Sequence, residues 1–149
     1  MSKWNDRAVW DGLIDGTACP ICTRGKPLDI IAELRSGWLT MPESAPLVGY
    51  ACFVLRKHVI EVHDLPEEDA IAFTFDLRQI SLAVTTATGA VKMNYEIHGN
   101  TLPHLHVHFF PRHIGDAFEG GPIDPTRVVQ PVYAPGQYIT MRDKIVAEL

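Results

Sequence analysis

The chain opens with a helical spacing of apolar residues and then changes to shorter apolar segments. Trp10, Leu13 and Ile14 are spaced as on one face of a helix, which Gly16 would end. Three short segments rich in aliphatic and aromatic residues follow, separated by glycine, serine or proline, at 28–34, 38–41 and 47–55. Segments of this kind are typical of an antiparallel meander of strands.

The longest regular pattern lies in the middle of the chain. Pro66 is followed by three acidic residues, and this combination indicates a helix start because proline and negative charge both suit a first helical turn. Apolar residues then recur at steps of three and four up to about Thr88, before Gly89; they are Ala70, Phe73, Leu77, Ile80 and Val84. This pattern predicts one amphipathic helix that packs on the sheet.

The remaining elements complete an α+β pattern. Two more strands are predicted near 91–97 and 104–110, and a terminal helix over 141–149 follows a stretch rich in glycine and proline. The order of strands, helix and strands predicts an α+β fold, with an antiparallel meander sheet of about five strands and one main packed helix. A chain of 149 residues suits a single domain over 1–149, with an N-terminal helix and an irregular C-terminal extension after about residue 113.

Composition excludes several classes of protein. Hydrophobic residues make up 46% and charged residues 21% of the chain, which is typical of a globular protein and not of a disordered one. The net charge of -5 disfavours binding to a nucleic acid polymer or to an anionic membrane. No apolar run is long enough to span a bilayer, and the N-terminal segment lacks the apolar core of a secretory signal, so we expect a cytoplasmic location.

Two of the three cysteines, Cys19 and Cys22, are separated by two residues. In a reducing compartment such a pair binds a metal or performs redox chemistry more often than it forms a structural disulfide. Both alternatives stay open, although the lack of a surrounding parallel β-α-β pattern disfavours the redox one. Cys52 lies inside an apolar run and is expected in the core.

The segment HLHVHFF at 104–110 carries the strongest chemical signal in the chain. Alternate side chains of a strand share one face, so His104, His106 and His108 are expected together on one face, about 6.6 to 6.8 Å from one to the next. The outer two would then be about 13 Å apart, too far to bind one zinc ion together, because zinc needs each nitrogen at about 2.0 to 2.1 Å. At least one imidazole is therefore available as a nucleophile or as a general acid or base.

This segment resembles the signature of the histidine triad family, in which single apolar residues separate three histidines and two apolar residues follow. The resemblance extends further, because CPIC at 19–22, RKHV at 56–59, HDLPEE at 63–68 and an asparagine before the triad occur in the family's order. It covers roughly residues 17–113.

The resemblance implies roles for individual residues. His106 resembles the nucleophile that attacks the α-phosphorus of a nucleotide, giving a nucleotidyl-histidine that water resolves, and His108 resembles the partner that helps the leaving group depart. Asn94 resembles the family asparagine that supports the triad, and Asn100 and Thr101 fall where residues usually contact phosphate. We therefore expect a nucleotidyl hydrolase or transferase for a purine nucleotide substrate, either a nucleoside phosphoramidate or a dinucleoside polyphosphate. The family also implies a homodimer.

In the branch of the family that carries an early CxxC pair, zinc is bound by two cysteines and two histidines. The resemblance assigns these ligands to Cys19, Cys22, His58 and His104. Four protein ligands leave no open position, which suits a structural zinc better than a catalytic one. The alternative to an enzyme is a zinc-stabilised module that binds a nucleotide or a partner without turnover.

Five other residues receive weaker expectations. His63 and His113 are expected at the surface, whereas His98, beside a glycine before the triad, could lie in either setting. Arg112 is expected to be a solvated residue at a strand end, with a substrate-binding charge as the alternative. Trp38 is expected to be a packing residue, although it is also a candidate for the wall of a purine pocket.

Overall fold

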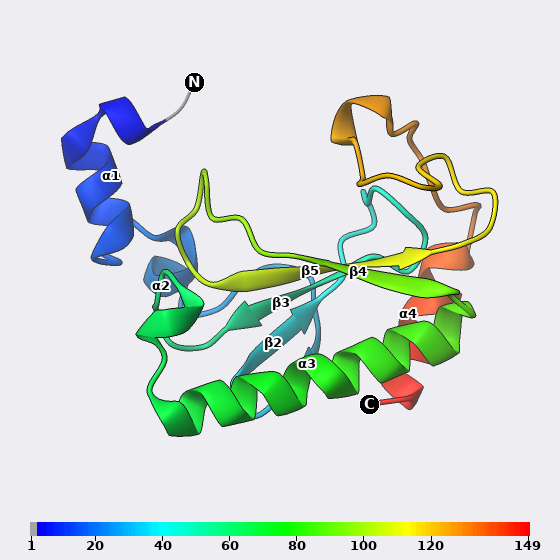
Figure 1. Ribbon diagram of the computed structural model, residues 1–149, viewed down its shortest axis with the longest axis horizontal. Helices are drawn as coiled ribbons and strands as arrows, with labels where there is room; N and C mark the ends of the chain where they lie inside the picture. The colour runs from blue at the N-terminus through cyan, green and yellow to red at the C-terminus, as the bar shows by residue number, and fades with distance from the viewer. Residues whose placement is uncertain (1–2) are drawn as a thin grey trace.

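Five antiparallel strands form one sheet in the computed structural model, which describes residues 3–149 (Figure 1). The strands are β1 (Ile30–Glu33), β2 (Gly37–Thr40), β3 (Ala51–Leu55), β4 (Lys92–Glu96) and β5 (His106–Arg112). The main helix, α3 (Glu67–Thr88), crosses one face of this sheet. The predicted α+β class is confirmed; the first two residues of the predicted domain lie outside the described part.

The strand order departs from a continuous meander. The order is β1-β2-β3-β5-β4, so β5 lies between β3 and β4. After β3 the chain runs through the 22 residues of α3 and returns as β4 at the far edge of the sheet. The next strand, β5, then lies between β3 and β4. An α-helix of that length spans about 33 Å, which is enough to cross the sheet. The strand that carries the histidines is therefore hydrogen-bonded on both sides, which fixes the directions of its side chains.

The other helices are short. They are α1 (Arg7–Ile14), α2 (Pro20–Arg24) and α4 (Gln137–Ala147), together with the 3-10 turns η1 (Lys3–Asn5), η2 (Val62–Asp64) and η3 (Pro125–Arg127). The sequence pattern did not predict α2, and α4 begins four residues earlier than expected. No helix within residues 3–149 is both long and apolar enough to cross a membrane.

All five strands differ somewhat from their predicted boundaries, and two of the differences have a clear structural meaning. The segment predicted over 47–55 is extended only from Ala51, because the preceding loop contains Gly49, whose φ of +81° breaks the extended backbone. The histidine strand begins at His106 and continues to Arg112, two residues later than predicted at each end. This second shift matters for the site.

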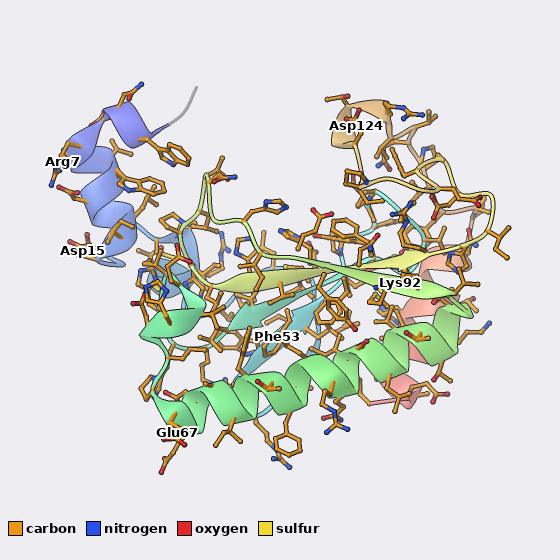
Figure 2. All side chains as sticks on the ribbon, in the orientation of Figure 1. Arg7, Asp15, Phe53, Glu67, Lys92 and Asp124 are labelled. Carbon is orange, nitrogen blue, oxygen red and sulfur yellow. The ribbon has the colours of Figure 1, made fainter. Side chains whose placement is uncertain are left out.

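The core lies between α3 and the sheet. Phe53 of β3 projects toward α3, and its ring centroid lies 6.0 Å from that of Phe73 (Figure 2). One polar residue shares this buried helix face: Asp76 is 1% exposed, and its carboxylate accepts hydrogen bonds from the backbone nitrogen and hydroxyl of Ser36 at 2.7 and 2.6 Å. Asp76 thus anchors the turn between β1 and β2 to the helix, a role that the apolar spacing did not predict.

Candidate active site and metal centre

The pairing of strands places two triad histidines on the face of the sheet opposite α3. His108 lies opposite Cys52 of β3 and Glu96 of β4, and His106 lies opposite Val54. The intervening Val107 is buried on the helix side. The alternation predicted from the sequence is therefore correct for His106 and His108, whose rings are partly exposed.

His104 lies just before β5, so only two of the three triad histidines belong to the strand itself. The backbone of the next residue, Leu105, is hydrogen-bonded to Val59 and to Leu55. The imidazole of His104 is only 1% exposed and is directed at the cysteine pair, with its Nδ1 3.5 Å from the Sγ of Cys19. His104 is therefore enclosed in this cluster, whereas the other two triad histidines are partly exposed.

Cys19, Cys22, His58 and His104 form one cluster, with one ligand atom from each within 4.8 Å of the others. The Sγ of Cys22 lies 3.3 Å from His58 Nδ1 and 3.7 Å from His104 Nδ1, and the two Nδ1 atoms are 3.1 Å apart. Tetrahedral zinc with ordinary bond lengths separates sulfur from nitrogen by about 3.6 Å and nitrogen from nitrogen by about 3.3 Å. The donor spacing therefore fits a zinc ion.

The hydrogen bonds of the two histidines also suit metal binding. His104 Nε2 donates to the carbonyl of Leu55 at 2.7 Å, and His58 Nε2 donates to the carbonyl of Ile14 at 2.9 Å. A proton on Nε2 leaves the Nδ1 lone pair of each ring free for a metal, the arrangement that backbone carbonyls commonly impose on metal-binding histidines. These contacts favour the metal interpretation of the cysteine pair over the redox one.

The ring of His106 is oriented by a backbone contact. Its Nδ1 donates to the carbonyl of His104 at 2.6 Å. With the proton on Nδ1, a neutral imidazole has its lone pair on Nε2. The same residue, His104, thus contributes its side chain to the candidate metal site and its carbonyl to the orientation of His106. The candidate metal site and β5 are connected through one residue.

The ring of His108 is packed in a more enclosed setting. Its Nδ1 is 2.7 Å from the hydroxyl of Tyr50, and its ring is nearly perpendicular to that of His106, with centroids 4.8 Å apart. Burial lowers the pKa of His108 to about 4, and the neighbouring rings of His106 and His98 act in the same direction. Burial also raises the pKa of Tyr50. At neutral pH, His108 is therefore uncharged and Tyr50 keeps its proton.

Comparison with known proteins agrees with this geometry. A model of the HIT domain matches residues 43–115, which include β3, α3, β4 and the histidines of β5. Residues 43–115 form a histidine triad domain. Among curated proteins no sequence matches the chain.

Several solved structures of the family resemble this chain. A histidine triad protein from Sinorhizobium meliloti is 25% identical with a TM-score of 0.72, over 80% of this chain and 88% of its own. A zinc-bound histidine triad protein from Mycobacterium smegmatis is 17% identical with a TM-score of 0.62, over 88% and 95%. The diadenosine triphosphate hydrolase of Plasmodium falciparum is 14% identical with a TM-score of 0.57, over 80% and 73%. The last two likenesses show the shared fold.

Within this histidine triad domain, the three predicted substrate-binding residues lie in two places. Asn94 lies in β4 on the triad face, and its side-chain oxygen accepts a hydrogen bond from Arg112 at 2.6 Å. Asn100 and Thr101 are exposed in the loop between β4 and β5, which leads into the triad. The indole nitrogen of Trp4 donates to the carbonyl of Asn100 at 2.9 Å, so the N-terminal segment contacts this loop.

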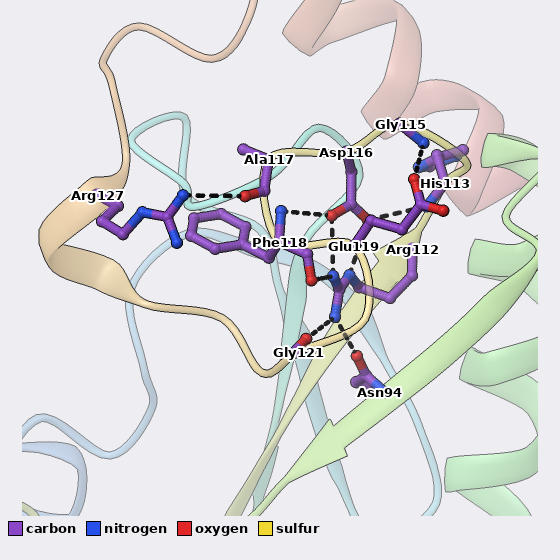
Figure 3. Close-up of polar contacts among 10 residues, drawn as sticks. All are labelled: Asn94, Arg112, His113, Gly115, Asp116, Ala117, Phe118, Glu119, Gly121 and Arg127. Atoms are coloured by element: carbon purple, nitrogen blue, oxygen red, sulfur yellow. Dashed lines mark hydrogen bonds and ion pairs between the residues drawn. The ribbon is translucent and has the colours of Figure 1, made fainter.

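Arg112 differs from the expectation of a solvated residue. It is 7% exposed, and its Nε and Nη2 atoms both donate to the carboxylate of Asp116 at 2.8 Å (Figure 3). The carbonyls of Phe118 and Gly121 accept further hydrogen bonds from the same guanidinium. The solvated interpretation is wrong because the chain turns back after β5 and surrounds the side chain with acceptors. Arg112 joins this loop to Asn94.

A groove of about 580 Å³ follows β4 on the same side of the domain, and Asn94, Glu96 and Arg112 contribute to its lining. The groove reaches Glu96, the residue that lies opposite His108 in the sheet. The triad face therefore borders a groove large enough to hold part of a small molecule.

The remaining candidates fall in different settings. Cys52 is buried as expected, and burial raises its pKa to about 12. His63 is exposed as expected, whereas the prediction for His113 is wrong, because its ring is half-buried and lies 3.1 Å from the carbonyl of Thr88. Trp38 is buried in the same cross-strand row as His106 and is covered by the guanidinium of Arg56 at 4.7 Å.

Sequence reasoning missed two residues of the site, Tyr50 and Glu96. The hydroxyl of Tyr50 contacts His108 directly. Glu96 is linked to the triad face through His98, whose Nε2 lies 2.8 Å from a carboxylate oxygen of Glu96. Tyr50 immediately precedes a strand, and Glu96 ends another, so neither position stands out in the sequence. Only the pairing of β5 with both neighbours reveals that they lie beside His108.

Proposed function

We propose that this protein is a nucleotidyl hydrolase or transferase that acts on nucleoside phosphoramidates or dinucleoside polyphosphates through a nucleotidyl-histidine intermediate. The observation that carries the proposal is the hydrogen bond from His106 Nδ1 to the carbonyl of His104. This contact keeps the proton on Nδ1 and the lone pair on Nε2, which is the nitrogen that would attack phosphorus. The histidine triad domain over residues 43–115 supports the same role.

The reaction would proceed in two displacements. In the first, Nε2 of His106 bonds to the α-phosphorus while the bond to the leaving group breaks and its electron pair stays with the leaving atom. In the second, water bonds to phosphorus and the bond to Nε2 breaks. Both steps need in-line positioning and donors for the phosphoryl oxygens.

Residues around the triad supply the donors that this chemistry needs. Because Arg112 occupies the amide oxygen of Asn94, the amide NH2 group of that side chain can donate to a substrate oxygen. Asn100 and Thr101 can contact phosphate from the loop, and His108 lies beside the nucleophile, where the leaving group departs in this proposal.

The metal proposal is a structural zinc held by Cys19, Cys22, His58 and His104. When bound, zinc would supply a cross-link between α2 and the start of β5, with no role in the displacements. By holding the His104 side chain, the cluster would also fix the carbonyl that orients His106. Zinc content measured by elemental analysis should be near one per chain and should fall in Cys19→Ser but not in Cys52→Ser. A metal-free wild type would contradict this assignment.

Mass spectrometry of the intact protein tests the enzymatic proposal. After incubation with an adenosine phosphoramidate under conditions that avoid acid, the wild type should carry AMP on His106 and release free AMP. His106→Asn should show neither product, whereas His63→Asn, which changes an exposed histidine, should behave as the wild type. If the wild type binds the nucleotide without turnover or adduct, the protein is the binding module that the sequence left as the alternative.

We also propose that the protein acts as a cytoplasmic homodimer. Large apolar side chains on the outer side of α3 and on β4 are half-exposed or more: Ile71, Phe75, Leu82 and Tyr95. Because β4 is an edge strand, it can pair with the same strand of a second copy about a two-fold axis. The free thiols of the metal cluster suit a reducing compartment, which supports the location.

A further inference from the structure

A fourth imidazole lies beside the triad. The ring centroid of His98, in the loop after β4, is 5.8 Å from that of His108. Its Nε2 is 2.8 Å from a carboxylate oxygen of Glu96, which lies directly opposite His108 in the sheet. The His98 side chain is 51% exposed, so it stands between the enclosed triad and solvent. Neither His98 nor Glu96 belongs to the triad motif.

The contact with Glu96 determines which nitrogen of His98 is available. A carboxylate only accepts hydrogen bonds, so Nε2 carries the proton that it receives. Within residues 3–149, no side chain or backbone group hydrogen-bonds the other nitrogen, Nδ1. A carboxylate in this position holds the ring in one orientation and leaves Nδ1 as the nitrogen that can exchange a proton, as in other carboxylate–histidine pairs. His98 therefore has one ring nitrogen held by Glu96 and a second ring nitrogen positioned to exchange a proton.

His108 is poorly suited to carry that proton. Burial lowers its pKa to about 4, so its neutral ring has no acidic proton to give near pH 7. Its Nδ1 is also occupied by the hydroxyl of Tyr50. A leaving group such as an amine nevertheless needs a proton when its bond to phosphorus breaks, because an amide anion is a very poor leaving group. The nearest further imidazole to His108 is that of His98, on the solvent side.

We propose that His98, oriented by Glu96, is the general acid and base of the reaction and that it directs the enzyme toward phosphoramidates. This inference rests on the proposed function. As His106 Nε2 bonds to phosphorus, the bond between phosphorus and the leaving nitrogen breaks, and the electron pair of that bond stays on the nitrogen. The proton on Nδ1 of His98 then transfers to this nitrogen and gives the neutral amine. Water then bonds to phosphorus, the bond to His106 breaks, and Nδ1 takes the proton that water loses. The sum is hydrolysis to AMP and free amine, with His98 restored.

Two substrates with different leaving groups test this role in the full-length protein. An N-alkyl phosphoramidate of AMP releases an amine that needs a proton, whereas the p-nitrophenyl ester of AMP releases a stable anion that does not. First-turnover rates are measured by rapid quench for the wild type, His98→Gln and the control His63→Gln. The control changes an exposed histidine that also has a carboxylate neighbour, Asp64 at 3.8 Å.

We expect His98→Gln to slow the first turnover of the phosphoramidate about 100-fold and that of the ester by less than about threefold, because general acid catalysis contributes only where the leaving group needs it. The same variant should accumulate AMP on His106 during turnover of the ester, since activation of water is also lost. Glu96→Gln should likewise slow the first turnover of the phosphoramidate more than that of the ester. His63→Gln should match the wild type throughout.

Two results would overturn the assignment while leaving the proposed function intact. Equal slowing of both substrates by His98→Gln would mean that the residue only supports the structure, and rates equal to those of His63→Gln would mean that it has no role. A wild type that turns over neither substrate would instead remove the proposed function, and the role of His98 with it.

Discussion

The substitution Asp116→Asn removes the charge of a buried ion pair while preserving the shape of the side chain. The side chains of Asp116 and Arg112 are each 9% exposed and share two hydrogen bonds of 2.8 Å, and the carboxylate also accepts from the backbone nitrogens of His113 and Phe118. An asparagine amide would turn an NH2 group toward one of these donors. The guanidinium would keep its neutral acceptors but lose its carboxylate.

The expected cost follows from this burial. Removal of one partner of a buried ion pair costs about 3–5 kcal/mol, and we expect about 3 kcal/mol because Arg112 retains the carbonyls of the loop and Asn94. For a chain of this size the midpoint of thermal unfolding should fall by about 6–12 °C. Urea unfolding at pH 7, followed by circular dichroism, measures the change in the free energy of unfolding.

A surface ion pair provides the control. Asp143 pairs with Arg142 at 2.8 Å, but their side chains are 62% and 37% exposed. Asp143→Asn should therefore change the free energy of unfolding by less than about 1 kcal/mol. If Asp116→Asn costs no more than Asp143→Asn, the reasoning from burial is refuted.

The same pair predicts a dependence on pH. Arg112 and the backbone donors hold the pKa of Asp116 well below its ordinary value in the folded protein, whereas in the unfolded chain it is about 3.9. The folded state therefore binds fewer protons, and the contribution is present above pH of about 4 and is lost as the pH falls further. The stability difference between wild type and Asp116→Asn should narrow below pH of about 4. A difference that stays constant down to acid pH would contradict the charge as its cause.

Three further predictions concern the site, the sheet and the assembly. Tyr50→Phe removes the hydroxyl next to His108 Nδ1 and should lower kcat about tenfold, the effect of one hydrogen bond, with little change in Tm; an unchanged kcat would show that the contact does not matter. Gly37→Ala places a Cβ atom against the carbonyl oxygen of Val54 and should lower the free energy of unfolding by about 1–3 kcal/mol, whereas an unchanged Tm would show that β2 and β3 shift to accommodate the methyl group. Leu82→Glu, on the exposed side of α3, should halve the mass seen in sedimentation velocity, and a wild type that is already monomeric would contradict the homodimer.

Much of this architecture could be predicted from local pattern. The spacing of apolar residues located α3 to within a residue or two, because burial of one helix face repeats every three to four positions along the chain. The alternation of HLHVHFF correctly separated His106 and His108 from the apolar residues between them. The resemblance to the histidine triad family also named the four residues whose ligand atoms lie within 4.8 Å of one another.

Other features depended on contacts between distant segments. The His104 ring is enclosed by the cysteine pair, and the backbone of the next residue bonds to Leu55 and to Val59, far earlier in the chain. Arg112 became buried only because the loop after β5 folds back over it, and no local signal distinguishes that outcome from a solvated strand end.

The sequence by itself determined the helix, the strand alternation and the residues capable of chemistry, since each follows from periodicity or from side-chain type. The tertiary structure alone decided the strand order, and that order placed Tyr50 and Glu96 on either side of His108. Periodicity describes how a segment divides its residues between inside and outside. Which segments meet depends on hydrogen bonding and packing between distant parts of the chain, and the chemistry available to His98 follows from that pairing.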